Sequence, residues 1–103
     1  MRPAPPPRLF DRDVRRLHCV GVGGMGLAPL AVYLAQSGFT VSGEDEALTE
    51  TVRAMLERER VAVGPVPAEC DLVVCSSAIA KTHAAYAVAA ARGLPLVRRG
   101  EML

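Results

Sequence analysis

Apolar and polar positions divide the chain into two kinds of segment that alternate along it. Short apolar runs rich in β-branched residues predict strands, and segments with apolar residues every three or four positions predict helices. The predicted strands are residues 17–22, 39–43, 61–64, 70–78 and 94–99. The predicted helices run from Leu27 to the Ser37-Gly38 stop, over 44–60, and over 81–93 with Thr82 as N-cap and Gly93 as the C-terminal stop.

Strands that alternate with helices over short connections predict an α/β fold with a parallel sheet. The fourth predicted strand has a continuous apolar centre, as expected for a strand covered on both faces. We therefore expect a Rossmann-like, three-layer domain over residues 14–103, with a five-stranded parallel sheet in the order 3-2-1-4-5. Residues 1–13, which contain RPAPPPR, are expected to form a flexible arm, because proline fixes φ and lacks an amide donor.

Composition narrows the class of protein. The chain has 103 residues and a formal net charge of +1, which suits one compact domain and gives no general reason to expect nucleic-acid binding. It has no apolar stretch long enough to span a membrane, and its first residues, MRPAPPPRLF, lack the apolar centre of a signal peptide, so we expect no export. Its three cysteines form no CxxC pair. A reduced, cytoplasmic setting without membrane contact is expected.

The glycine loop between the first strand and the first helix is the clearest candidate site. Its spacing is Gly21-x-Gly23-x-x-Gly26, with an additional glycine at position 24. In this setting the first glycine allows a tight turn, the second lets the backbone approach a diphosphate, and the third permits close packing of helix on strand. The start of the helix then presents unpaired amides to the anion. The competing interpretation is that the glycines only tighten the turn.

Polar residues follow two other strands that end at the same edge of the sheet. Glu44 and Asp45 come about 20 residues after the loop, where a carboxylate meets a ribose hydroxyl in dinucleotide-binding folds. Asp45 is also a candidate cap for the second helix. Ser76 and Ser77 offer hydroxyls and amides where a phosphate or sugar would lie, or they cap the end of the strand.

Other chemistry has little support in the sequence. The only lysine is Lys81, and the glycines of a P-loop do not precede it, so no ATP cradle is expected. His18 and His83 have no carboxylate or cysteine at metal-ligand spacing, and His18 lies within an apolar run typical of a satisfied core residue. No metal site, catalytic residue or hydrolase motif is predicted.

Four separated stretches together resemble the N-terminal domain of the Mur ligases. They are HCVGVGGMGL at 18–27, VSGED at 41–45, VVCSSAI at 73–79 and LVRRGEML at 96–103. They occur in the order and at the spacing found in that family. The chain departs from the family pattern at Glu44, where a small residue is common, and at Gly100, where alanine is common.

The resemblance implies a domain that binds the UDP part of UDP-N-acetylmuramate. It implies that Asp45 lies by the uridine and that Gly21 shapes the loop. The implied ligand-binding residues are Val22, Gly23, Gly24, Met25 and Gly26 at the diphosphate, with Ser76 and Ser77 in the nucleotide-sugar cleft. The parent enzyme would use ATP and Mg to join L-alanine to the muramoyl carboxylate in peptidoglycan synthesis. That chemistry would require central and C-terminal domains that follow this segment in the family.

The resemblance therefore predicts that this chain alone binds its ligand weakly and catalyses nothing, whether it is an excised domain or a stand-alone relative. Two alternatives stay open. One is a regulatory or oxidoreductase domain that binds NAD(H) through the same loop. The other is a domain that has lost its ligand and acts by contact with another protein.

Overall fold

The computed structural model describes residues 8–9, 12–23, 27–76 and 82–98, and within them a five-stranded parallel sheet. The sheet strands are β3 (Arg16–Val20), β4 (Thr40–Glu44), β5 (Val61–Val63), β6 (Leu72–Cys75) and β7 (Leu96–Arg98). The helices are α1 (Leu27–Gln36), α2 (Glu50–Arg58) and α3 (Ala84–Arg92). The strand order is β5-β4-β3-β6-β7, which is 3-2-1-4-5 when counted from β3. The predicted fold class and strand order are confirmed.

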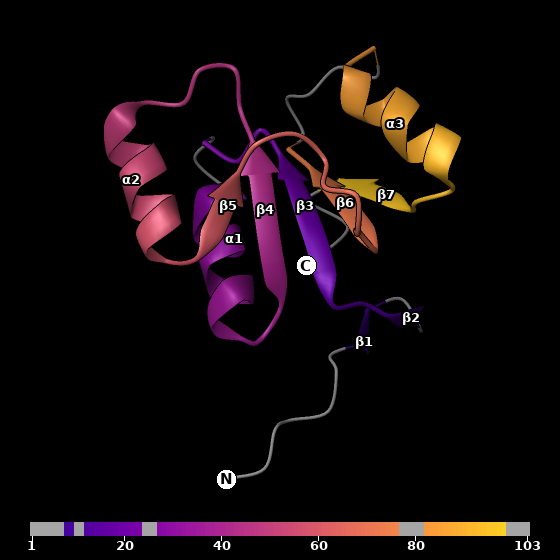
Figure 1. Ribbon diagram of the computed structural model, residues 1–103, viewed down its shortest axis with the longest axis horizontal. Helices are drawn as coiled ribbons and strands as arrows, with labels where there is room; N and C mark the ends of the chain where they lie inside the picture. The colour runs from indigo at the N-terminus through magenta and orange to yellow at the C-terminus, as the bar shows by residue number, and fades with distance from the viewer. Residues whose placement is uncertain (1–7, 10–11, 24–26, 77–81, 99–103) are drawn as a thin grey trace, which may run out of the picture.

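Helices cover both faces of the sheet, as Figure 1 shows. Successive side chains of a strand point to opposite faces. Leu17 and Cys19 of β3 belong to the cluster that contains the buried residues of α1 and α2, whereas Val20 belongs to the cluster that contains Ala85 and Ala89 of α3. α1 and α2 therefore lie on one face and α3 lies on the other.

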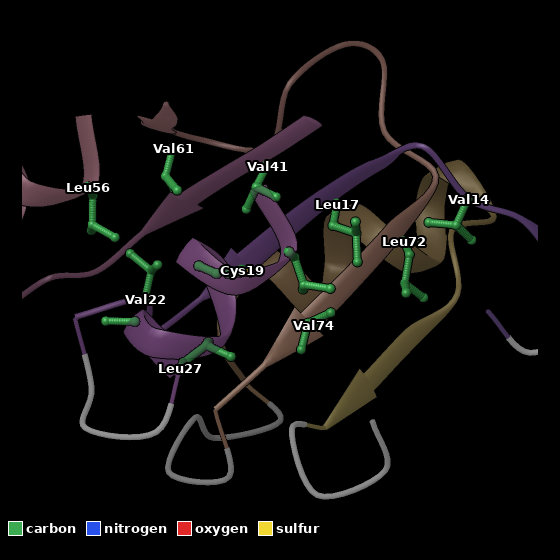
Figure 2. Close-up of a cluster of buried hydrophobic side chains, with 13 residues drawn as sticks. Val14, Leu17, Cys19, Val22, Leu27, Val41, Leu56, Val61, Leu72 and Val74 are labelled. Carbon is green, nitrogen blue, oxygen red and sulfur yellow. The ribbon is translucent and has the colours of Figure 1, made fainter. Parts of the chain in front are cut away.

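The larger cluster forms the main core, and Figure 2 shows its side chains converging from the strands, α1 and α2. Its fully buried members include Leu17, Leu27, Leu56 and Leu72. Cys19 lies among them, and burial raises the pKa of its thiol to about 12. Cys19 therefore acts as a small apolar residue and not as a nucleophile.

The first strand is shorter than predicted. β3 ends at Val20, because Gly21 takes a left-handed φ of 84° and turns the chain out of the sheet. The amides of Gly21 and Val22 then both donate to the carbonyl oxygen of Glu44, at 2.8 and 3.1 Å. A residue with a side chain would be strained at this φ, so a tight turn directly after β3 requires glycine.

The helix starts also differ from the predictions. The second helix was predicted from residue 44, but α2 begins at Glu50, where Thr49 is the N-cap and its hydroxyl accepts a bond from the Val52 amide. The predicted cap of the third helix was Thr82, but His83 is the N-cap, because its Nδ1 atom accepts a bond from the Ala85 amide. The predicted stop at Gly93 is confirmed by its left-handed φ of 66°.

The part of the predicted arm that the structure describes contains a short strand pair. β1 (Arg8–Leu9) runs antiparallel to β2 (Arg12–Asp13), and the pair lies near the start of β3 in Figure 1, away from the strand ends that carry the candidate site. Within the described part of the chain, none of the helices has both the length and the apolar character required to cross a membrane.

Candidate functional site

A cavity of about 630 Å³ opens at the carboxyl edge of the sheet, and we call it the edge cavity. It lies where the end of β3, the segment after β4 and the start of α3 come together. Its lining residues are Gly21, Glu44, Asp45, Glu46, Ala47, Thr82, His83 and Ala84. Ligands of doubly wound folds bind at this edge, and the volume lies within the range of small-molecule sites.

The described amides of the glycine loop are bound to the segment at the end of β4. Gly21 and Val22 donate to the Glu44 carbonyl, and the Gly23 amide donates to Oδ2 of Asp45 at 2.9 Å. The amides of Val22 and Gly23, which were predicted to bind the diphosphate, therefore already donate to acceptors within the protein. The other predicted loop contacts, Gly24, Met25 and Gly26, lie outside the described residues.

Asp45 fastens the glycine loop to the segment that follows β4. While its Oδ2 accepts from Gly23, its Oδ1 accepts from the Ala47 amide at 2.8 Å, which forms a local turn. The alternative that Asp45 caps the second helix is wrong, because Thr49 occupies that position. Each carboxylate oxygen of Asp45 thus already accepts a hydrogen bond from a backbone amide. The predicted contact of Asp45 with the uridine is not tested by this structure and stays a prediction.

Ser76 lies at the end of β6, beside the glycine loop. Its amide donates to the Val20 carbonyl at 2.9 Å, which continues the pairing of β6 with β3 by one residue. Ser76 is half-buried and is not among the residues that line the edge cavity. Ser77 lies outside the described residues, so the predicted contact of this pair with a nucleotide sugar is untested.

His18 is the only polar residue among the fully buried side chains of the described chain, and it contacts Glu44, which lines the edge cavity. Its Nε2 atom is 2.7 Å from Oε2 of Glu44, and its Nδ1 atom is 2.7 Å from the hydroxyl of Ser42. The prediction that His18 is a satisfied core residue is confirmed. Its carboxylate partner was missed, because it comes from the neighbouring strand.

The protonation of His18 follows from its surroundings. Burial lowers its pKa below the ordinary 6.5, and the hydrogen bond and charge of Glu44 oppose this only in part. In the neutral ring, Nε2–H donates to Glu44 and Nδ1 accepts the hydroxyl proton of Ser42. The three side chains therefore form one hydrogen-bonded row across β3 and β4.

Acidification should weaken the fold through His18. In the unfolded chain His18 takes up a proton below pH 6.5, whereas in the folded chain burial opposes that protonation. The contribution of His18 to the free energy of unfolding is therefore fully present above pH 6.5. Below that pH it should fall by up to about 1.4 kcal/mol per pH unit until the folded-state pKa is reached. Urea unfolding at several pH values should show this loss in the wild type and a smaller one in His18→Gln. A wild type that gains stability relative to the variant at low pH would show instead that Glu44 holds a charged imidazolium.

Several cavity residues were not among the predicted binding residues. Glu44 was named with Asp45 as an acidic residue at the position of a ribose contact but was not among the binding residues that the family resemblance implies. Glu46 and the start of α3 were not singled out as ligand contacts. In the described chain, the edge cavity included, no three side chains of His, Cys, Asp or Glu come together as a possible metal site.

Comparisons with known proteins agree with this architecture. Residues 16–103 match the model of the Mur ligase family, catalytic domain. The chain is 42% identical over 95 residues to a UDP-N-acetylmuramate–L-alanine ligase of Roseobacter denitrificans and 38% identical over 96 residues to one of Chlorobium phaeobacteroides. These alignments cover 88% of this chain but only 20% and 21% of the two enzymes, so the chain spans about a fifth of their length.

A solved structure shares the fold. The UDP-N-acetylmuramate-alanine ligase of Thermotoga maritima superposes with a TM-score of 0.71 at 23% identity, over 84% of this chain and 21% of that one. At this identity the solved structure shows a shared fold only. The assignment to a family rests on the family match and on the sequence identity to the two relatives. The chain belongs to the Mur ligase family.

Proposed function

We propose that this domain binds the UDP part of UDP-N-acetylmuramate and serves as the N-terminal domain of a UDP-N-acetylmuramate–L-alanine ligase. The observation that carries the proposal is the edge cavity, where the glycine loop, the acidic end of β4 and the start of α3 meet. The relatives from Roseobacter denitrificans and Chlorobium phaeobacteroides are named as ligases of that substrate. Such a reaction would use ATP and a nucleotide sugar, and we infer a cytoplasmic setting for the protein.

Charge divides the proposed site into two parts. Glu44, Asp45 and Glu46 all line the edge cavity, and like charge disfavours phosphate groups beside them. The start of α1, which follows the glycine loop, carries the positive end of a helix dipole and suits an anion. We therefore orient the diphosphate toward the glycine loop and α1, with the nucleoside toward the acidic end of β4.

The role of this chain in catalysis would be to bind and orient one substrate. ATP supplies the energy for amide-bond formation in a ligase of this kind. The residues present do not fit an ATP or Mg²⁺ site: the sequence lacks a P-loop, and the described residues include no cluster of three potential metal ligands. We assign those contacts to the other four-fifths of the ligase and expect the isolated chain to be inactive.

Calorimetric titration of the chain with UDP-N-acetylmuramate, UDP and NADH tests the proposal. Both UDP compounds should bind and NADH should not. Affinity should be weak, because contacts to the sugar and carboxylate from other domains are missing. Binding of NADH alone would overturn the proposal in favour of a dinucleotide-binding domain, and binding of none of them by the folded chain would also reject it.

A further inference from the structure

Two neighbouring carboxylates at the end of β4 differ in whether they have an oxygen free to accept a hydrogen bond from a ligand. Both oxygens of Asp45 accept backbone amides, those of Gly23 and Ala47. Glu44 has one oxygen on His18, and no donor within the described residues contacts the other. Glu44 is therefore the acid of this pair with an oxygen available to the edge cavity.

The strand register fixes where the Glu44 side chain lies. His18 of β3 pairs with Ser42 of β4, so Glu44 is two residues further along β4 and on the same face of the sheet. This is the face that carries α3, and the Glu44 side chain lines the edge cavity with 29% of its surface exposed. The carboxylate therefore stands between the buried His18 ring and the open cavity.

His18 holds the Glu44 carboxylate in a defined orientation. The ring is fully buried and is fixed at its other nitrogen by Ser42, so it cannot follow a mobile carboxylate. A glutamate side chain normally loses considerable rotamer freedom on binding. Because the bond to His18 restricts the side chain before the ligand arrives, less of that cost falls on binding.

The charge of the edge cavity selects the kind of group that contacts Glu44. A carboxylate surrounded by Asp45 and Glu46 favours hydrogen-bond donors that carry no negative charge. The nucleoside of UDP offers two such groups, the ribose 2′,3′-diol with its two hydroxyls and the uracil N3–H. A diol presents two adjacent hydroxyls to one carboxylate, and a carboxylate after the second strand of a glycine-loop unit is where nucleotide-binding folds contact ribose.

We propose that Glu44, positioned by His18, binds the ribose diol of the nucleotide, while Asp45 acts as the clamp of the glycine loop. This inference rests on the proposed function, since it names a contact of the same ligand. It changes the assignment that the family resemblance implies, in which Asp45 is the acid beside the uridine. His18 is a positioning residue and does not itself touch the ligand.

Paired titrations test the contact. UDP, 2′-deoxy-UDP and 3′-deoxy-UDP are titrated into the wild type and into Glu44→Ser. Hydrogen bonds to a charged group are strong, so loss of at least one of the hydroxyls should weaken wild-type binding by roughly 10- to 100-fold. In Glu44→Ser the same change of ligand should have less than about a threefold effect, because the acceptor is already absent. Glu44→Gln, which keeps the side-chain shape, serves as the second variant if the serine variant fails to fold.

Glu46→Ser is the matched control. It removes one negative charge from the same cavity, but Glu46 is exposed and does not contact His18. In this variant, removing the ribose hydroxyl from UDP should weaken binding as much as it does in the wild type, a loss of affinity that we call the hydroxyl penalty. His18→Gln should keep more of that penalty than His18→Ala, because an amide group can still donate to Glu44. If His18 only stabilised the fold, the loss of affinity caused by removing the ribose hydroxyl would not depend on whether residue 18 can donate a hydrogen bond to Glu44.

The outcomes separate this inference from the proposed function. If UDP binds and the hydroxyl penalty is the same with and without Glu44, the contact is refuted while the UDP site stands. If the effect of Glu44→Ser disappears with N3-methyl-UDP and persists with the deoxy ligands, Glu44 contacts the base and the inference fails. If the folded wild type does not bind UDP, both proposals fail together.

Discussion

Gly43→Ala should lower the free energy of unfolding by about 1–3 kcal/mol, although it adds only one methyl group. A Cβ at Gly43 would lie 2.8 Å from both Cβ and Cγ2 of Val22 and 2.9 Å from Cγ1. Val22 is fully buried, and rotation about its side-chain bond cannot move its own Cβ away. The backbone of the glycine loop must therefore shift, and UDP affinity should fall together with stability.

Gly64→Ala is the control for Gly43→Ala. A Cβ at Gly64 would meet nothing within 4 Å, and Gly64 has no positive φ. The same chemical change should there leave stability unchanged or raise it by about 0.4–1 kcal/mol, because it restricts the unfolded chain. Urea unfolding of the two variants compares them directly, and equal effects would show that the contact with Val22 is not the cause.

A second substitution tests the contact itself. Val22→Ala removes two of the three atoms that a Cβ at Gly43 would approach. Gly43→Ala should therefore cost less stability in the Val22→Ala background than in the wild type, with a coupling energy of about 0.5–3 kcal/mol. Additive effects in the double variant would contradict the steric explanation.

The architecture is predictable because it follows from apolar periodicity. The continuous apolar run of β6 and the spaced apolar residues of α1 indicate which surfaces must be buried, and βα alternation restricts the strand order. The boundaries are less predictable where side chains compete with the backbone. Asp45 ties the chain after β4 to the glycine loop and to Ala47, so the acidic segment there does not become the first turn of α2.

The sequence predicts where the candidate site lies, but it does not predict which residues contact one another there. The glycine spacing indicates the correct sheet edge, yet it cannot show that Gly21 and Val22 share the Glu44 carbonyl. The row from Ser42 through His18 to Glu44 joins residues 24 and 26 positions apart and depends on the register of β3 against β4. Such pairings arise from packing, and no local pattern encodes them.

Gly23→Val should abolish detectable UDP binding while leaving the fold intact, in contrast to Gly43→Ala. A Cβ at Gly23 would lie 2.9 Å from Cδ1 of Leu48 and 3.1 Å from Oδ2 of Asp45. The Leu48 contact is with the far end of a flexible, half-buried side chain, which can turn aside at small cost. The Asp45 contact is with the carboxylate that clamps the loop, so the clamp should open.

The loss of binding and the small loss of stability have different causes. Opening the clamp removes the hydrogen bond from the Gly23 amide, which is worth about 1 kcal/mol of stability. Binding depends on loop position and on close approach of the backbone to the diphosphate, and valine disturbs the first and obstructs the second. Affinity for UDP should therefore fall at least about tenfold, a change of about 1.4 kcal/mol.

Calorimetry with UDP and urea unfolding of the same samples measure both quantities for Gly23→Val. Gly64→Val is the matched control, because it adds the same side chain where the first carbon meets no neighbour, and it should bind UDP as the wild type does. Leu48→Ala separates the two contacts, since it removes the atom nearest to the new Cβ and leaves the clamp in place. A folded Gly23→Val protein with wild-type affinity would show that the diphosphate does not approach this loop, and the ligand would then have to be sought elsewhere on the sheet edge.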